Sequence, residues 1–351
     1  MAVFTLYLDE TGSFRSLRGP LGVRVVGGVL LRGAPSDHEQ PLRAALRLAL
    51  AWWPGDWHAC EVGSTFRIAQ ALQRVAAGAL PPELRELRSQ VDGLSYERIN
   101  GLRSSAPRLL AALRAESARL LERVDATLRD DVAGRWAPCT IVLCAEHDLE
   151  SEANRAPRYP RMLEAVVERT AWSFLEHDPV DSIELHVVAA EGGACSAAVP
   201  ASLHQTIATS YENARALWEK HAPSPPVLQI PPVRFAPADA GVPGLVLADF
   251  AIYRLQGGST PNMSVSPQAA LAWSGPAIAG TRPIGAIPFA VCGVGDIPSL
   301  LRDVLRGARP ASEAEASLSE MARRRSLPQG TLCATVQDAL ALIRRWKELG
   351  L

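Results

Sequence analysis

The chain has 351 residues and a formal net charge of −1 at pH 7, with 48% hydrophobic and 21% charged residues. This length allows one large domain or two modest ones, and the composition is that of a globular protein. The near-neutral charge gives no global basic field, which argues against nucleic-acid binding but leaves room for a local basic patch. We expect no membrane span, no secretory signal and a cytoplasmic location, because neither a long apolar run nor a basic leader is present.

The chain opens on a predicted strand that ends in acidic residues. Residues 4–8 are apolar and are followed by Asp9, Glu10 and, two positions later, Gly12. A short apolar run bounded by glycine is typical of a buried strand. A carboxylate pair at its end is stabilised by a cation such as a divalent metal, and the alternative is a solvated turn. Strand neighbours point to opposite faces, so Glu10 ranks below Asp9 as a ligand.

A second strand and a helix are predicted next. Residues 21–31 indicate a strand antiparallel to the first, and Gly27-Gly28 within it indicates a bulge or a close backbone approach. Residues 42–53 are apolar at helical spacing, and the predicted helix stops before Pro54.

A short segment, residues 57–62, carries two candidate metal ligands, His58 and Glu61. His58 either approaches a metal or relays a proton, or it is a structural histidine beside Trp57, and the sequence leaves both interpretations open. Residues 64–136 are rich in leucine, alanine and arginine and indicate a helical insertion. Its arginines either face solvent or contact phosphates.

The following part alternates strands with helices, which favours a parallel α/β arrangement. The predicted strands are 139–145, 182–190 and 227–235, and the predicted helices are 161–176, 202–221 and 245–255. Residues 256–298 are rich in glycine, proline and serine, and helices are predicted at 299–305, 312–325 and 335–349. We therefore expect a domain over residues 1–255, with the insertion at about 64–136, and a linker with a helical C-terminal extension over 256–351.

Two further acids stand out by their positions. Glu191 directly follows the predicted strand 182–190, and Asp249 lies between apolar neighbours of the helix 245–255. An aspartate on such a helix is rarely buried without a partner; the alternative is an exposed stripe or an ion pair with arginine. A polar loop accounts for Glu146, His147 and Asp148 more simply than a ligand cluster does. The six cysteines form no C-x-x-C pair, so we expect neither a zinc cage nor a disulfide framework.

Short motifs in a fixed order resemble a large bacterial family. They are Leu8-Asp9-Glu10-Thr11-Gly12, Val25-Val26-Gly27-Gly28-Val29, His58-Ala59-Cys60-Glu61, Arg158-Tyr159-Pro160-Arg161-Met162-Leu163 and Leu245-Val246-Leu247-Ala248-Asp249-Phe250. This order resembles the domain-of-unknown-function family numbered thirty-eight hundred, whose members open with D-E-S-G and close with L-Q-L-A-D. Here Thr11 stands where serine is usual and Val246 where glutamine is usual.

The resemblance implies a ribonuclease-H-like mixed β-sheet flanked by helices, and it implicates Asp9, Glu61 and Asp249. Glu191 is added because ribonuclease-H-like enzymes carry an acid at the end of a strand. Such carboxylates suit Mg²⁺ or Mn²⁺ in two-metal phosphodiester hydrolysis. We therefore expect a metal-dependent nuclease acting on DNA or RNA, with these four acids as ligands and His58 beside them.

Two other functions stay open on the sequence. The near-neutral charge and the helical additions favour a non-catalytic binding or assembly module, with a protein partner or a second copy of the chain. A hydrolase of a small phosphorylated metabolite is the third hypothesis. The family's bacterial setting suits defence against phage, but no residue argues for that role.

Overall fold

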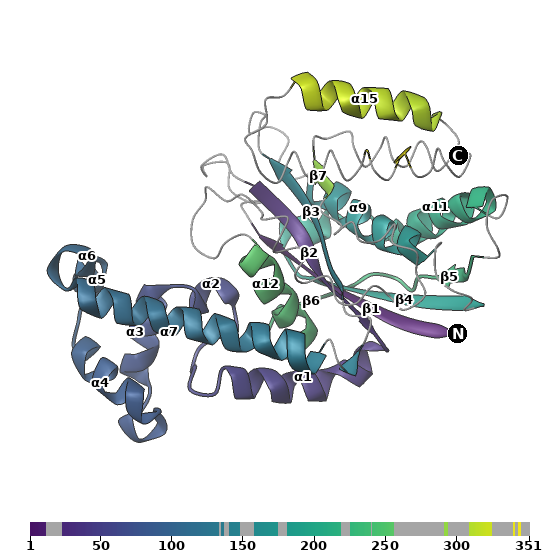
Figure 1. The fold of residues 1–351 in the computed structure, drawn as a ribbon. Coiled ribbons are helices and arrows are strands. Elements are labelled where there is room, and N and C mark those ends of the chain that lie inside the picture. The colour runs from purple at the N-terminus through teal and green to yellow at the C-terminus, as the bar shows by residue number, and fades with distance from the viewer. Residues whose placement is uncertain are drawn as a thin grey trace.

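The computed structural model of the chain is an α/β fold built on one mixed sheet (Figure 1). The structure describes residues 1–11, 23–132, 135–136, 140–147, 158–174, 181–218, 225–239, 241–255, 291–293, 309–324, 340 and 343–344. These residues form the strands β1 (Ala2–Thr11), β2 (Val23–Arg32), β3 (Thr140–His147), β4 (Ser182–Ala190), β5 (Val227–Gln229), β6 (Arg234–Ala236) and β7 (Val291–Gly293).

The strand order is β5-β4-β1-β2-β3-β7, and β6 also pairs with β4. Strand β2 is antiparallel to β1 and β3, whereas β4 is parallel to β1, and β5 and β6 are parallel to β4. This mixed arrangement confirms the predicted α/β class and is compatible with a ribonuclease-H-like sheet.

Two strand predictions need correction. The single strand expected at residues 227–235 is two short strands, β5 and β6, because Pro231 and Pro232 between them cannot donate to a sheet ladder. Strand β7 pairs in parallel with β3, in a stretch for which the composition predicted only a linker.

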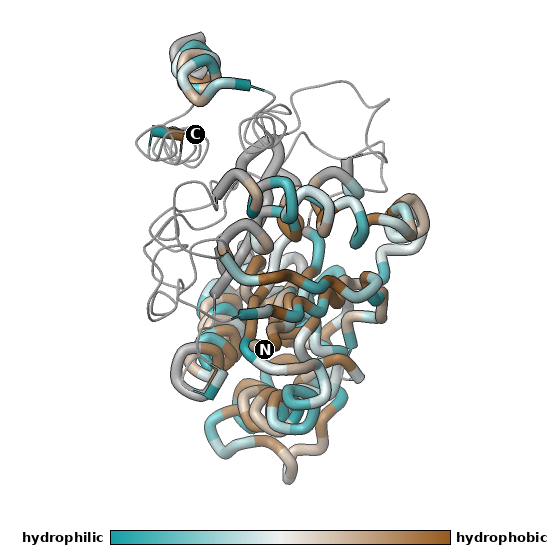
Figure 2. The backbone as a smooth tube through the Cα atoms, turned by 90° about the vertical axis from the view of Figure 1, so that its right-hand side faces the viewer, coloured by the Kyte–Doolittle hydropathy of each residue, from teal (hydrophilic) through white to brown (hydrophobic). Residues whose placement is uncertain are grey.

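Helices cover both faces of the sheet. The described helices are α1 (Pro35–Ala49), α2 (Ala59–Val62), α3 (Thr65–Arg74), η1 (Ala77–Ala79), α4 (Pro82–Val91), α5 (Tyr96–Asn100), α6 (Leu102–Ser105), α7 (Pro107–Ala126), the π-helix η2 (Thr127–Val132), α9 (Arg158–Ser173), α10 (Ala194–Ala197), α11 (Leu203–Trp218), α12 (Pro243–Leu255) and α15 (Ala311–Arg324). Figure 1 shows α9 and α11 on one side of the sheet and α12 and α1 on the other. Figure 2, coloured by hydropathy, shows hydrophobic residues in brown along segments in the interior of the fold.

Several helix predictions can be compared with these bounds. The helix expected at residues 42–53 begins earlier, at Pro35, and ends at Ala49. The predicted insertion corresponds to α3 through η2, while the division into domains stays a prediction. Helix α15 matches the prediction at 312–325, whereas 299–305 and most of 335–349 lie outside the described residues. None of the helices described has the length and apolar character to cross a bilayer.

The central strand β1 is buried on both faces, and its side chains alternate between two cores. Phe4, Leu6 and Leu8 belong to the core that includes α9 and α11. Tyr7 belongs to the core that includes α1, α7 and α12. This period of two fixes which acid at the end of β1 faces which helical layer.

Helix α12 lies very close to β1 and β2, and glycines permit the close approach. A Cβ added at Gly28 of β2 would lie 1.8 Å from the carbonyl oxygen of Tyr7 and 2.9 Å from the Cβ of Ala248. A Cβ added at Gly244 would lie 2.4 Å from the Tyr7 ring. The expectation that Gly27-Gly28 marks a close approach is thus confirmed at Gly28.

We predict that Gly28→Ala strongly destabilises the protein, because the new methyl group would overlap a backbone oxygen that cannot move aside by rotating a side chain. The expected loss in the free energy of unfolding is more than about 2 kcal/mol, measured by urea denaturation. The matched control is Gly78→Ala, since nothing lies within 4 Å of a Cβ at that position. Equal stability of the two variants would contradict the packing described here.

Candidate acidic site

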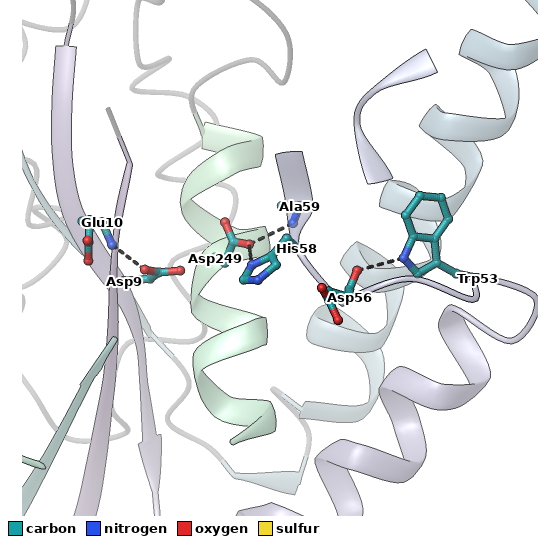
Figure 3. Close-up of polar contacts among 7 residues, drawn as sticks. All are labelled: Asp9, Glu10, Trp53, Asp56, His58, Ala59 and Asp249. Atoms are coloured by element: carbon teal, nitrogen blue, oxygen red, sulfur yellow. Dashed lines mark hydrogen bonds and ion pairs between the residues drawn. The ribbon is translucent and has the colours of Figure 1, made fainter. Parts of the chain in front are cut away.

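The site begins with Asp9, which lies near the end of β1 and pairs in register with Gly27 of β2. Its residue exposure is 9%, and its Oδ1 accepts a hydrogen bond of 2.7 Å from the backbone N–H of Glu10. Asp9 follows Tyr7 by two positions, so its side chain lies on the α12 side of the sheet. Figure 3 shows the carboxylate directed towards α12.

Asp249 comes from α12, a helix whose residues 245–248 and 250–252 are all buried. Such a helix is apolar on every side, as expected for one packed between a sheet and other helices. The Asp249 side chain is 14% exposed, so the alternative of an exposed stripe is wrong. Among the described residues, its hydrogen-bond and ion-pair partners lie on the segment that leads into α2, and none of them is an arginine.

Those partners are His58 and Ala59. The backbone N–H of Ala59 donates to Oδ2 of Asp249 at 2.8 Å, and Nδ1 of His58 lies 3.5 Å from the same oxygen. Asp249 thereby binds an amide in the first turn of α2, where a helix has N–H groups without intrahelical acceptors. The His58 side chain is 40% exposed and forms the solvent side of the contact (Figure 3).

The electrostatics of this group depend on burial and on the two neighbouring carboxylates, Asp9 and Asp249. Burial, followed by the negative charge of Asp249 and then that of Glu10, raises the pKa of Asp9 well above its ordinary value. The hydrogen bond that His58 donates to Asp249 is the largest of the effects that raise the pKa of His58, and burial opposes it. The pair therefore calls for a proton or a cation, and His58 supplies part of the positive charge.

The other two predicted acids are placed differently. Glu61 lies on α2, two positions after Ala59, and its Oε1 is 3.5 Å from Nη2 of Arg67. Glu191 follows β4 and is exposed, and its backbone N–H donates to the carbonyl of Ala236 at 2.8 Å. In the described part of the chain, neither side chain forms a hydrogen bond or an ion pair with Asp9 or Asp249. Within the parts of the chain described above, no three His, Cys, Asp or Glu side chains form a group that could hold a metal ion.

Glu10 lies on the opposite side of the sheet from Asp9. A Cβ at Gly192 would lie 2.5 Å from its Oε1, and Figure 3 shows the Glu10 side chain on the side of β1 away from α12. The prediction that the two neighbouring acids point to opposite faces is confirmed. Glu146 and His147 end β3, and Asp148 lies outside the described residues.

Sequence reasoning identified His58 but missed residues 53–56, which precede it in the segment between α1 and α2. Trp53 donates from Nε1 to the carbonyl of Asp56 at 2.9 Å, and Asp56 contributes to the raised pKa of His58. The only available signal was the turn-like order Trp53-Pro54-Gly55-Asp56, which indicates a tight loop but not its partner.

Comparison of the chain with protein-family models, with curated proteins and with solved structures found no match.

We predict that Asp9→Asn stabilises the protein at neutral pH. A folded-state pKa above the unfolded value means that the folded state holds the proton more tightly. Stability therefore falls as the pH rises from about 3.8 through the folded-state pKa. Asparagine carries no charge and can still accept from the Glu10 amide, so the gain at neutral pH should be on the order of 1 kcal/mol.

Denaturation of both proteins at several pH values would check this prediction. The gain should be present at pH 7 and should vanish below about pH 4, where aspartate is protonated in both states. Glu191→Gln, at an exposed position, is the control and should change stability little. A loss of stability in Asp9→Asn at pH 7 would show that the Asp9 charge is favourably compensated.

Proposed function

We propose that this chain is a divalent-metal-dependent nuclease that hydrolyses phosphodiester bonds of DNA or RNA, and that it is a divergent relative of the family named above. The observation that carries the proposal is the buried Asp9 close to Asp249 across the sheet–helix interface, where burial and then the charge of Asp249 raise the pKa of Asp9. Paired carboxylates with perturbed pKa values are frequent at functional sites.

The donor set fits a hard cation. Two carboxylates offer oxygen ligands, and Mg²⁺ often uses only one or two protein carboxylates and keeps several waters. We assign Asp9 and Asp249 as the ligands, with Glu61 and Glu191 as candidates for a second ion in a two-metal arrangement. When bound, Mg²⁺ or Mn²⁺ would stabilise the charge that develops on the phosphoryl oxygens and favour ionisation of the attacking water.

The chain's own residues would orient the substrate, donate a proton and contact the phosphates. Asp9 and Asp249 orient the reacting group from the buried side, and the backbone N–H groups of Glu10 and Ala59 hold the two carboxylates in place. His58, partly exposed and with its pKa raised by Asp249, would carry a proton that it can donate to the leaving 3′ oxygen. Arginine side chains would contact the flanking phosphates.

A non-catalytic binding or assembly module is the second candidate. Asp249 already accepts from the first turn of α2, which is a structural role sufficient to explain a buried aspartate. The absence of a three-ligand group among the described residues also favours this candidate. Catalysis with Mn²⁺ decides between the two.

The test is titration of Mn²⁺ and Mg²⁺ into the protein with labelled single-stranded, double-stranded and hybrid substrates. We expect cleavage that depends on the metal and falls by about a hundredfold or more in Asp9→Asn and Asp249→Asn. Loss of an outer-shell partner alone typically costs about 10–100-fold. Both substitutions keep an acceptor for the neighbouring amide, and Glu122→Gln, on the exposed face of α7, is the control.

Two results would contradict the nuclease proposal. One is the absence of cleavage of every substrate by the parent with either metal. The other is equal cleavage by the parent and by Asp9→Asn. Binding of a macromolecule without cleavage would then favour the assembly module.

A further inference from the structure

The segment between α1 and α2 brings His58 and Ala59 to Asp249. Residues 53–58 form no regular helix or strand, yet two hydrogen bonds tie this segment down. At one end Trp53 Nε1 donates to the Asp56 carbonyl at 2.9 Å, and at the other end the Ala59 N–H donates to Asp249 at 2.8 Å. Figure 3 shows the two bonds on either side of His58.

Trp53 is itself firmly held. Its residue exposure is 7%, its ring packs edge-to-face on Trp52 with centroids 6.0 Å apart, and its backbone N–H donates to the Leu50 carbonyl at 2.9 Å. The loop passes directly over its indole edge, since a Cβ at Gly55 would lie 3.2 Å from Nε1. Because the Trp53 ring is fixed, the hydrogen bond from its Nε1 restrains the backbone of the loop at Asp56.

Two of the groups that Trp53 restrains, Asp56 and His58, have little packing of their own, whereas Ala59 is buried in the core. Asp56 is exposed and the His58 side chain is 40% exposed. A partly exposed segment of this kind opens locally at low free-energy cost unless hydrogen bonds restrain it. The bond from a buried indole therefore limits how far His58 and Ala59 can move from Asp249.

We infer that Trp53 is a positioning residue for the acidic site, acting through the Asp56 carbonyl to keep His58 and the Ala59 amide on Asp249. Its catalytic consequence rests on the proposed nuclease function. Its structural consequence, the closure of the segment on Asp249, does not depend on that function.

The chain offers a matched pair of substitutions for the test. Trp53→Phe keeps an aromatic ring and removes the donor to Asp56. Trp52→Phe removes the donor of the neighbouring, equally buried ring, whose Nε1 donates to Glu116 at 3.0 Å, and it keeps an aromatic ring against Trp53. Hydrogen exchange of the Ala59 amide, resolved by NMR, reports the closure directly, and thermal unfolding reports general loss of packing.

We expect Trp53→Phe to speed exchange of the Ala59 amide by about threefold to tenfold, the factor for loss of one hydrogen bond. Trp52→Phe should leave the exchange rate of the Ala59 amide unchanged. The two variants should lower the unfolding temperature by similar amounts. With metal-dependent cleavage established for the parent, Trp53→Phe should also raise the Mn²⁺ concentration needed for half-maximal rate more than Trp52→Phe does.

Two exchange results would overturn the inference. If Ala59 exchange is unchanged in Trp53→Phe, the partly buried Trp57 or other packing holds the loop without Trp53. If both variants speed exchange equally, the effect is general loosening. An inactive parent would remove the nuclease proposal alone, because the exchange measurement needs no activity. A cleaving parent whose Mn²⁺ dependence is the same in both variants would overturn the catalytic part of the inference.

Discussion

The close packing of α12 on the β1–β2 pair is the constraint on which the candidate site depends. Aspartate has a single methylene between backbone and carboxylate, so Asp249 can influence Asp9 only if the helix backbone lies close to the strand. Gly28 and Gly244 allow that approach, because any side chain at either position would occupy the space of β1 atoms. Without it, the two acids would belong to separate layers, and each would be solvated or paired locally.

Two ionised carboxylates so close together repel each other and destabilise the folded state. Hydrogen bonds from backbone amides offset part of this free-energy cost. Asp9 accepts from Glu10 and Asp249 accepts from Ala59, so each buried carboxylate has one neutral donor. Hydrogen bonds to a charged group favour its ionised form, but burial and mutual repulsion prevail at Asp9. An apolar residue at the Asp9 position would pack at lower free-energy cost than this carboxylate.

The sequence predicted what depends on local pattern. The strand at residues 4–8, the opposite faces of Asp9 and Glu10, and the buried character of the helix around Asp249 all follow from periodicity. The pairing of Ala59 with Asp249 does not, because 190 positions separate the two residues and no local rule links an amide to a distant carboxylate. Likewise no local rule predicted the ion pair of Glu61 with Arg67, which lies in the first turn of the next helix. The proline pair at 231–232 indicated a break in the predicted strand. It could not indicate that the two resulting strands, β5 and β6, would both pair with β4.

The helical insertion contributes to the site because its helix α7 packs against α2 and is hydrogen-bonded to it. On α7, Ser117 donates from its hydroxyl to the carbonyl of Val62 at 2.8 Å, and it is buried. A Cβ at Gly63 would lie 2.0 Å from the Tyr253 hydroxyl oxygen, so the end of α2 also packs tightly on α12. Helix α2 has only four residues and cannot be stable alone, so its position is set by these contacts and by Asp249. The insertion, α12 and the loop of residues 53–58 thus all contact the short helix α2. Of the two side chains in the contact with α2, His58 is more exposed to solvent than Asp249.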